Sequence, residues 1–110
     1  MASLPMAKGG GGVEKAQYKY QWIPYATWTK VFDIEKPIKS GFFSAVANYN
    51  PAAGNSCCAT FSIANNVASM NYGTDGSNYW KVSISNNEVS FYCSDIRGGN
   101  FYLGIGIIEE

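Results

Sequence analysis

Apolar and polar residues alternate along most of this chain, which is the periodicity of a β-strand with one buried face. The alternation is clearest over 80–93, where Trp80, Val82 and Ile84 are interleaved with polar residues before the pair Asn86-Asn87. A second alternating run follows that pair. Because Asn tolerates the positive φ angles that a two-residue turn requires, these residues predict a β-hairpin.

Short runs of this kind recur about every ten residues, separated by Gly, Asn, Pro and Ser. The predicted strands cover residues 18–23, 27–34, 41–49, 57–63, 67–72, 80–85, 89–93 and 101–107. No segment shows the longer 3.6-residue period that a βαβ fold would need. The sequence therefore predicts an all-β domain, an antiparallel two-sheet sandwich of about eight strands with a jelly-roll-like arrangement.

Two of these runs leave alternatives open. Residues 41–49 are apolar at both parities, which fits a strand buried on both sides, a β-bulge, a subunit contact or a short helix. In the first run Tyr18, Tyr20 and Trp22 share one parity, so they form a stripe that belongs to an interface or to the core. We expect Trp22 and Trp28 in the core.

The first residues differ from the rest of the chain. An unbroken glycine run, Gly9 to Gly12, cannot bury apolar surface, so residues 1–17 are predicted to be a flexible arm or tether and 18–110 the sandwich domain. The first eight residues lack the apolar stretch of a secretory signal, and no apolar run is long enough to span a bilayer.

Composition narrows the function classes. Charged residues make up 15% of the chain and the formal net charge is zero, which argues against nucleic-acid binding and against binding to anionic membranes. The chain has no His, so the commonest general base and metal ligand are missing. We therefore expect no enzymatic activity, no cofactor and no metal.

The remaining candidates for chemistry are carboxylates and thiols. Asp75 and Asp95 fall in predicted loops that could meet at one end of the sandwich, but a catalytic pair needs a buried acid with a raised pKa. Cys57, Cys58 and Cys93 are an odd number without a signal peptide, so we expect thiols, with a disulfide from Cys93 to one of the adjacent pair as the alternative.

The segment 71–80 is the richest in side chains that recognise ligands. We take Tyr72, Asp75, Asn78 and Tyr79 as candidate ligand-binding residues, because aromatic rings stack on sugars and amides or carboxylates bond hydroxyls. The alternative is a hairpin loop whose Gly and Asn residues only set the turn and whose Trp80 is core.

A second candidate surface concerns contacts between subunits. Gly104 and Gly106 share one face of the last strand and would let another chain approach closely. With Tyr18, Tyr20 and Phe43 from the ambiguous strands, they are the candidate interface residues.

The chain resembles small bacteriophage virion modules, such as tail-fibre tips, head fibres and capsid-decoration proteins. Three features carry this resemblance: the glycine-rich arm, the Asn-Asn turns and the terminal strand Phe101-Tyr102-Leu103-Gly104-Ile105-Gly106-Ile107. This resemblance implies a non-enzymatic virion protein made in the host cytoplasm, forming a homo-oligomer, with a trimer favoured. It would dock on a capsid or tail protein and present a face to a host-surface glycan. The alternative is a stand-alone carbohydrate-binding module for neutral glycans.

Overall fold

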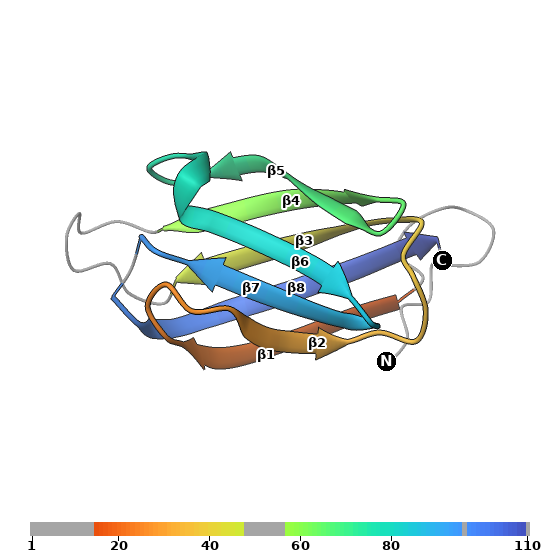
Figure 1. Ribbon diagram of the computed structural model, residues 1–110, viewed down its shortest axis with the longest axis horizontal. Coiled ribbons are helices and arrows are strands. Elements are labelled where there is room, and N and C mark those ends of the chain that lie inside the picture. The colour runs from red at the N-terminus through yellow and green to blue at the C-terminus, as the bar shows by residue number, and fades with distance from the viewer. Residues whose placement is uncertain (1–14, 48–56, 96, 110) are drawn as a thin grey trace.

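The computed structural model describes residues 15–47, 57–95 and 97–109, which form eight β-strands and one short 3₁₀ helix (Figure 1). The elements are β1 (Lys15–Ile23), β2 (Thr29–Asp33), β3 (Ser40–Ala47), β4 (Cys58–Ala64), β5 (Val67–Gly73), η2 (Ser77–Tyr79), β6 (Trp80–Ser85), β7 (Glu88–Cys93) and β8 (Gly99–Glu109).

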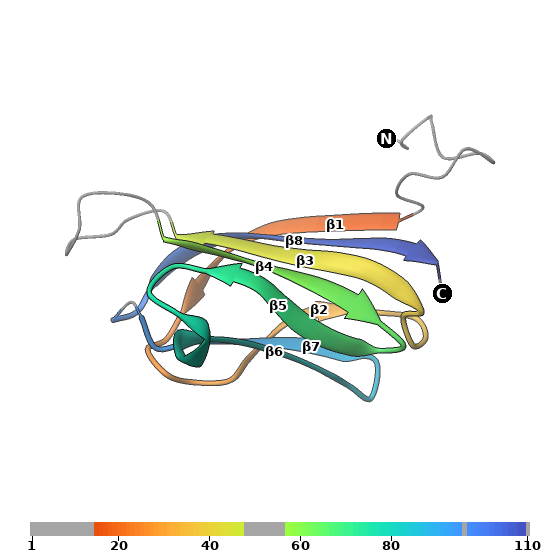
Figure 2. The ribbon, with the colours of Figure 1, turned by 90° about the horizontal axis from the view of Figure 1, so that it is seen from above.

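The strands form two layers, which Figure 2 shows edge-on. The larger sheet has the order β1-β8-β3-β4-β5 and the smaller sheet the order β2-β7-β6, and all neighbours are antiparallel. β3, β4 and β5 follow one another as a meander, whereas the chain changes sheets between β1 and β2, β2 and β3, β5 and β6, and β7 and β8.

The predicted fold class is confirmed, because the described residues form an antiparallel two-sheet sandwich of eight strands. β1 begins at Lys15, three residues before the predicted start of the sandwich. The glycine run of the predicted arm lies outside the described residues. Over the part of the chain that the structure describes, no helix has the length and apolar character needed to cross a bilayer.

The core lies between the layers and is built from aromatic rings in mutual contact. The Phe43 ring lies 5.9 Å from Phe61 and 5.7 Å from Phe91, and Phe91 lies 5.4 Å from Phe101. Trp80 is 2% exposed, and its indole N–H donates to the Thr74 carbonyl at 2.8 Å. Burying side chains of this size stabilises the fold by about 1.5–3 kcal/mol each.

Both Asn-Asn pairs form the predicted tight turns. Asn65 and Asn66 join β4 to β5 with φ angles of 51° and 66°, and Asn86 and Asn87 join β6 to β7 with 53° and 61°. These left-handed conformations match the twist of the paired strands, and Asn adopts them at lower cost than most residues.

Three aromatic predictions are corrected. Trp22 and Trp28 were expected in the core, but they are 56% and 49% exposed. Phe43 was expected at a subunit contact, but it is completely buried at the centre of the core, so its side chain does not reach the surface. Its neighbour Phe42 takes the outward position of β3 and is 41% exposed.

The strand β3 resolves the ambiguity of residues 41–49 as far as Ala47. It is a central strand with Phe43 and Ala45 in the core and Phe42 and Val46 outward, and its register with β8 shifts between Ser40 and Gly41. The cysteine prediction is also confirmed, since no disulfide joins Cys57, Cys58 and Cys93.

Candidate functional site

Strand β1 presents its aromatic residues outward and its long polar residues inward. Tyr18, Tyr20 and Trp22 are 78%, 50% and 56% exposed. A shift of one residue would have turned all three rings toward the core, because successive side chains on a strand point to opposite faces. The observed register therefore leaves large apolar surface in water that the fold itself could have buried.

The inward side chains of β1 bond to the backbone of β2 across the gap between the sheets. Lys19 Nζ donates to the Val31 carbonyl at 2.7 Å, and Gln17 Nε2 donates to the Asp33 carbonyl at 2.8 Å. Lys19 Nζ also lies 5.7 Å from the centre of the Phe32 ring. These bonds satisfy acceptors on an edge strand and keep the aromatic side of β1 outward.

The residues opposite β1 on the larger sheet continue the aromatic surface. The register places Tyr18 beside Gly104 and Tyr20 beside Tyr102, whose rings are 4.6 Å apart. We call this whole surface the outer face. It includes Ala16, Tyr18, Tyr20, Trp22, Phe42, Ser44, Val46, Thr60, Ser62, Tyr72, Asn100, Tyr102, Gly104 and Gly106. The register adds Ser40, Cys58, Ala64, Val67 and Ser69 on the same side, and Glu109 pairs with Ser40 where the face ends.

The outer face is uncharged, because none of its residues is Lys, Arg, Asp or Glu. The smaller sheet differs. There Lys30 lies 3.0 Å from Asp33 and 4.0 Å from Glu88, and Lys81 Nζ lies over the Tyr92 ring at 5.0 Å. The smaller sheet thus carries ion pairs beside its aromatic pair Trp28 and Tyr92, whereas the outer face of the larger sheet carries exposed rings without charge.

Glycines allow several of the exposed rings to lie against the backbone. A Cβ on Gly106 would lie 2.6 Å from Phe42 Cε1, and one on Gly104 would lie 3.4 Å from Tyr18 Cδ1. Trp22 similarly covers Gly98, which has a φ of 80°. Because these rings occupy the space of absent side chains, they lie low on the sheet, and their broad faces contribute to the surface.

Small polar residues lie between the rings. One transverse row of the sheet runs from Tyr18 through Gly104, Ser44 and Thr60 to Tyr72 on the opposite edge. In the neighbouring part of the sheet, Asn71 Nδ2 donates to Ser62 Oγ at 2.8 Å. With strands about 4.8 Å apart, the row from Tyr18 to Tyr72 spans about 19 Å.

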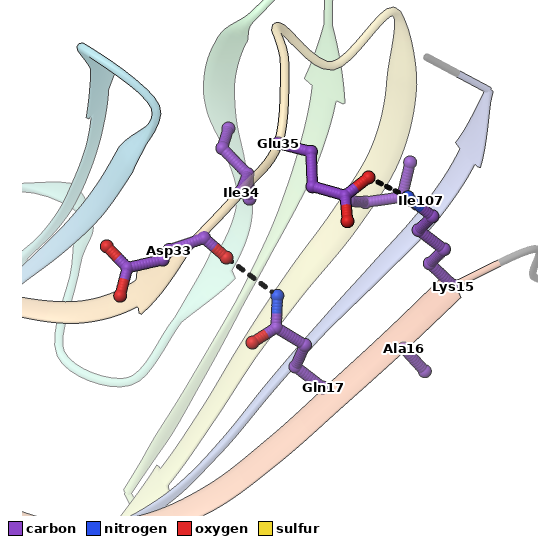
Figure 3. A pocket seen from close by; sticks show the side chains of 7 residues that line it. All are labelled: Lys15, Ala16, Gln17, Asp33, Ile34, Glu35 and Ile107. Carbon is purple, nitrogen blue, oxygen red and sulfur yellow. Dashed lines mark hydrogen bonds and ion pairs between the residues drawn. The ribbon is translucent and has the colours of Figure 1, made fainter. Parts of the chain in front are cut away.

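A pocket of about 310 Å³ opens where β1 meets the segment after β2, and it is lined by Lys15, Ala16, Gln17, Asp33, Ile34, Glu35 and Ile107 (Figure 3). Lys15 Nζ and Glu35 Oε1 face each other across it at 2.7 Å. Lys15 holds the pKa of the Glu35 carboxyl below its usual value by a hydrogen bond and by its charge. Three charged residues line the pocket: Lys15 and Glu35 pair with each other, and Asp33 pairs with Lys30.

A second cluster joins Cys57, Asp75 and Asp95 at the end of the sandwich where β4 begins. The Sγ atom and one carboxyl oxygen of each Asp all lie within 4.8 Å of one another. Burial, and next a hydrogen bond with Asp75, raise the pKa of Asp95. Burial, and next the Asp95 charge, raise the pKa of the Cys57 thiol to about 12. The raised pKa of Asp95 favours its neutral form.

This pair meets one of the conditions that the sequence analysis set for catalysis, namely a carboxyl with a raised pKa. One oxygen of each carboxyl lies within 4.8 Å of the other, and the carboxyl groups of retaining glycosidases are about 5–5.5 Å apart. The cluster also offers three ligand atoms, one fewer than a closed zinc site uses.

The four candidate ligand-binding residues lie on β5, in the turn that follows it and on η2. Tyr72 is on the outer face and 58% exposed, and a carboxyl oxygen of Asp75 lies within 4.8 Å of one of Asp95. Asn78 and Tyr79 are exposed on η2, which connects the two sheets. Of the interface candidates, Tyr18, Tyr20, Gly104 and Gly106 do come together on the outer face, and Trp22, Phe42 and Tyr102 belong with them.

Sequence reasoning found the aromatic stripe of β1 but not its direction. Tyr102 and Phe42 were missed. Phe42 has the opposite parity to Phe43, the candidate chosen on that strand, whereas Tyr102 shares a parity with the candidate Gly104. That shared parity was the available signal.

Comparison with known proteins relates this fold to phage tailspikes. No family model and no curated protein match the sequence. Among solved structures, the tailspike protein gp49 of Acinetobacter baumannii bacteriophage Fri1, a capsular polysaccharide depolymerase, matches with a TM-score of 0.55 and 12% identity over 86% of this chain and 18% of that one. The Acinetobacter phage vB_ApiP_P1 tailspike protein matches with a TM-score of 0.43 and 12% identity over 96% and 24%. The chain thus spans less than a quarter of either tailspike, and the likeness to gp49 is one of fold.

Proposed function

We propose that this protein is a non-enzymatic attachment module of a phage tail or virion surface, which docks on a tail or capsid protein and uses the outer face for contact. The observation that carries the proposal is the orientation of β1. Its rings are in water and its Lys and Gln side chains point inward, although the opposite register would bury more apolar area.

The fold supports the phage context. A tailspike contains a segment of the same fold that covers most of this chain, at a TM-score of 0.55. That tailspike is a capsular polysaccharide depolymerase, which supports a phage tail context for a chain of the same fold. A virion location for this chain follows from the same proposal.

The site chemistry supports a binding role over catalysis. The chain has no His, and the acid pair Asp75 and Asp95 lies beside the buried Cys57 thiol, whose pKa is raised to about 12. The pocket beside β1 is closed on one side by the Lys15–Glu35 ion pair. None of these groups is arranged to receive a scissile bond.

The test is to purify particles from cells that produce this protein and to examine them by mass spectrometry and by immunogold labelling. We expect the chain on the particles, and antiserum raised against residues 15–109 should slow adsorption to the host. A particle preparation that lacks the chain would contradict the virion role and would favour a stand-alone carbohydrate-binding module.

The non-enzymatic part is tested separately. Incubating the protein with capsular polysaccharide from the host of those particles should release no reducing ends. Release that disappears in the Asp75→Asn variant would overturn this part of the proposal.

A further inference from the structure

We propose that the outer face binds an uncharged polysaccharide, whose sugar rings lie flat on Tyr18, Tyr20 and Trp22 along β1. This inference rests on the proposed function and names the target of its contact surface. Three observations support it: the lack of charge, the low position of the rings, and the polar groups beside them.

The lack of charge on the outer face favours an uncharged polymer over a polyanion as its ligand. A polyanion is held by Lys and Arg, and none lies on the outer face. In the sequence, Lys15 precedes the stripe and Lys19 lies within it, but both side chains are on the other side of β1, toward Glu35 and the Val31 carbonyl. An uncharged polymer loses no salt bridge here and leaves no charged side chain desolvated.

The low position of the rings selects against a second copy of this chain. Packed sheets interdigitate side chains that stand upright from both surfaces. On the outer face, the rings of Phe42 and Tyr18 instead cover Gly106 and Gly104. A flat ligand with one apolar side, such as a pyranose ring, fits such a surface, because aromatic faces contribute contact area with few torsions to freeze.

Polar groups suited to hydroxyls accompany the rings. The hydroxyls of Tyr18, Tyr20 and Tyr102 are at the rim of their rings, and Ser44 and Thr60 lie on the row that continues to Tyr72. Hydroxyl groups both donate and accept, which matches the hydroxyls of a neutral sugar. Residues two apart on β1 are about 7 Å apart, so successive rings can contact successive parts of one chain.

The test is affinity electrophoresis of the folded protein in native gels that contain dextran, laminarin, galactomannan or the host capsule, against gels that contain alginate or hyaluronan. We expect retardation in at least one uncharged polymer, and the affinity should stay the same between about 0.05 M and 0.5 M salt. Retardation in none of the uncharged polymers, or only in the polyanions, would overturn the proposal.

The chain supplies a matched control for the site. Trp22→Ala removes a 56% exposed indole from the outer face, and Trp28→Ala removes a 49% exposed indole that stacks on Tyr92 of the other sheet. We expect Trp22→Ala and Tyr20→Ala to weaken binding about tenfold or more, and Trp28→Ala to leave it unchanged. Equal losses in Trp22→Ala and Trp28→Ala would contradict the assignment.

Two outcomes separate this inference from the function on which it rests. If the protein is found on virions and its antiserum slows adsorption, but no uncharged polymer retards it, the outer face has another target and only the glycan inference fails. If light scattering shows an oligomer that Trp22→Ala dissociates, the face belongs to a second copy and the glycan inference fails as well.

Discussion

At the residue scale, the Asp75–Asp95 pair shows how a fold changes the chemistry of two ordinary acids. Asp75 lies in the turn after β5 with a φ of 67°, and Asp95 follows β7, so the two come from segments twenty residues apart. One oxygen of Asp95, Oδ2, is buried and accepts no hydrogen bond among the described residues. A protonated Asp95 is therefore better suited to its place than a charged one.

This arrangement predicts a dependence of stability on pH. The raised pKa of Asp95 means that the native state holds this proton more tightly than the unfolded chain does. Its contribution is complete below the ordinary pKa of 3.8 and is lost as pH rises through the raised value. Asp95→Asn should thus stabilise the protein near neutral pH by on the order of 1 kcal/mol and lose that advantage near pH 4.

Urea unfolding of both proteins at a series of pH values measures this effect. A variant whose free energy of unfolding differs from wild type by the same amount at every pH would show that Asp95 carries no excess proton in the native state.

At the element scale, the pairing of β3 with β8 includes a contact between an aromatic ring and a glycine. Phe42 on β3 lies over Gly106 on β8, and the two residues are paired in the sheet register. The exposed ring is thus held by the backbone of its neighbour. This contact contributes to the strand pairing as well as to the shape of the outer face.

We predict that Gly106→Ala destabilises the protein by about 1–3 kcal/mol, because the new Cβ would lie 2.6 Å from Phe42 Cε1 and the ring must move. Removing the ring in the double variant Gly106→Ala/Phe42→Ala should recover part of this loss, which urea unfolding in a double-mutant cycle measures.

Gly104→Ala is the matched control, since its Cβ would meet Tyr18 and Ser44 only at 3.4 Å. Equal losses at both glycines, or additive effects of Gly106→Ala and Phe42→Ala, would rule out the proposed contact.

The strands were predictable from the sequence and the directions of their faces were not. Alternation shows that Tyr18, Tyr20 and Trp22 share a side, but it is silent about which side meets the core. Hydrophobicity alone points inward, and the inward position is taken instead by Gln17 and Lys19, which bond to carbonyls of β2 that only the fold brings near. The contact between Asp75 and Asp95 is likewise set by tertiary structure, since both lie in loops without periodicity.

At the scale of the whole molecule, the sandwich has two unlike outer surfaces. The smaller sheet carries ion pairs between Lys30, Asp33 and Glu88, and the larger sheet carries exposed rings. Under the proposed function, the exposed rings of the larger sheet are the contact side and the ion-paired sheet stays hydrated.

The resemblance to virion modules predicts a homo-oligomer, with a trimer favoured. Multi-angle light scattering should then give about three times the 12.0 kDa mass of one chain. If the outer face is reserved for a glycan, Trp22→Ala should leave that mass unchanged. A monomer whose mass does not vary with concentration would contradict the oligomer.

The side chains of Gln17 and Lys19 also affect whether neighbouring copies of this protein can pair through the edge of β2. Their N–H groups already occupy the carbonyls of Asp33 and Val31 along the free margin of β2. An extended segment of a neighbouring molecule that approaches this margin must compete with these two donors, which disfavours strand-by-strand growth into fibrils there. A molecule protected in this way can be displayed at high density without its copies annealing to one another along β2.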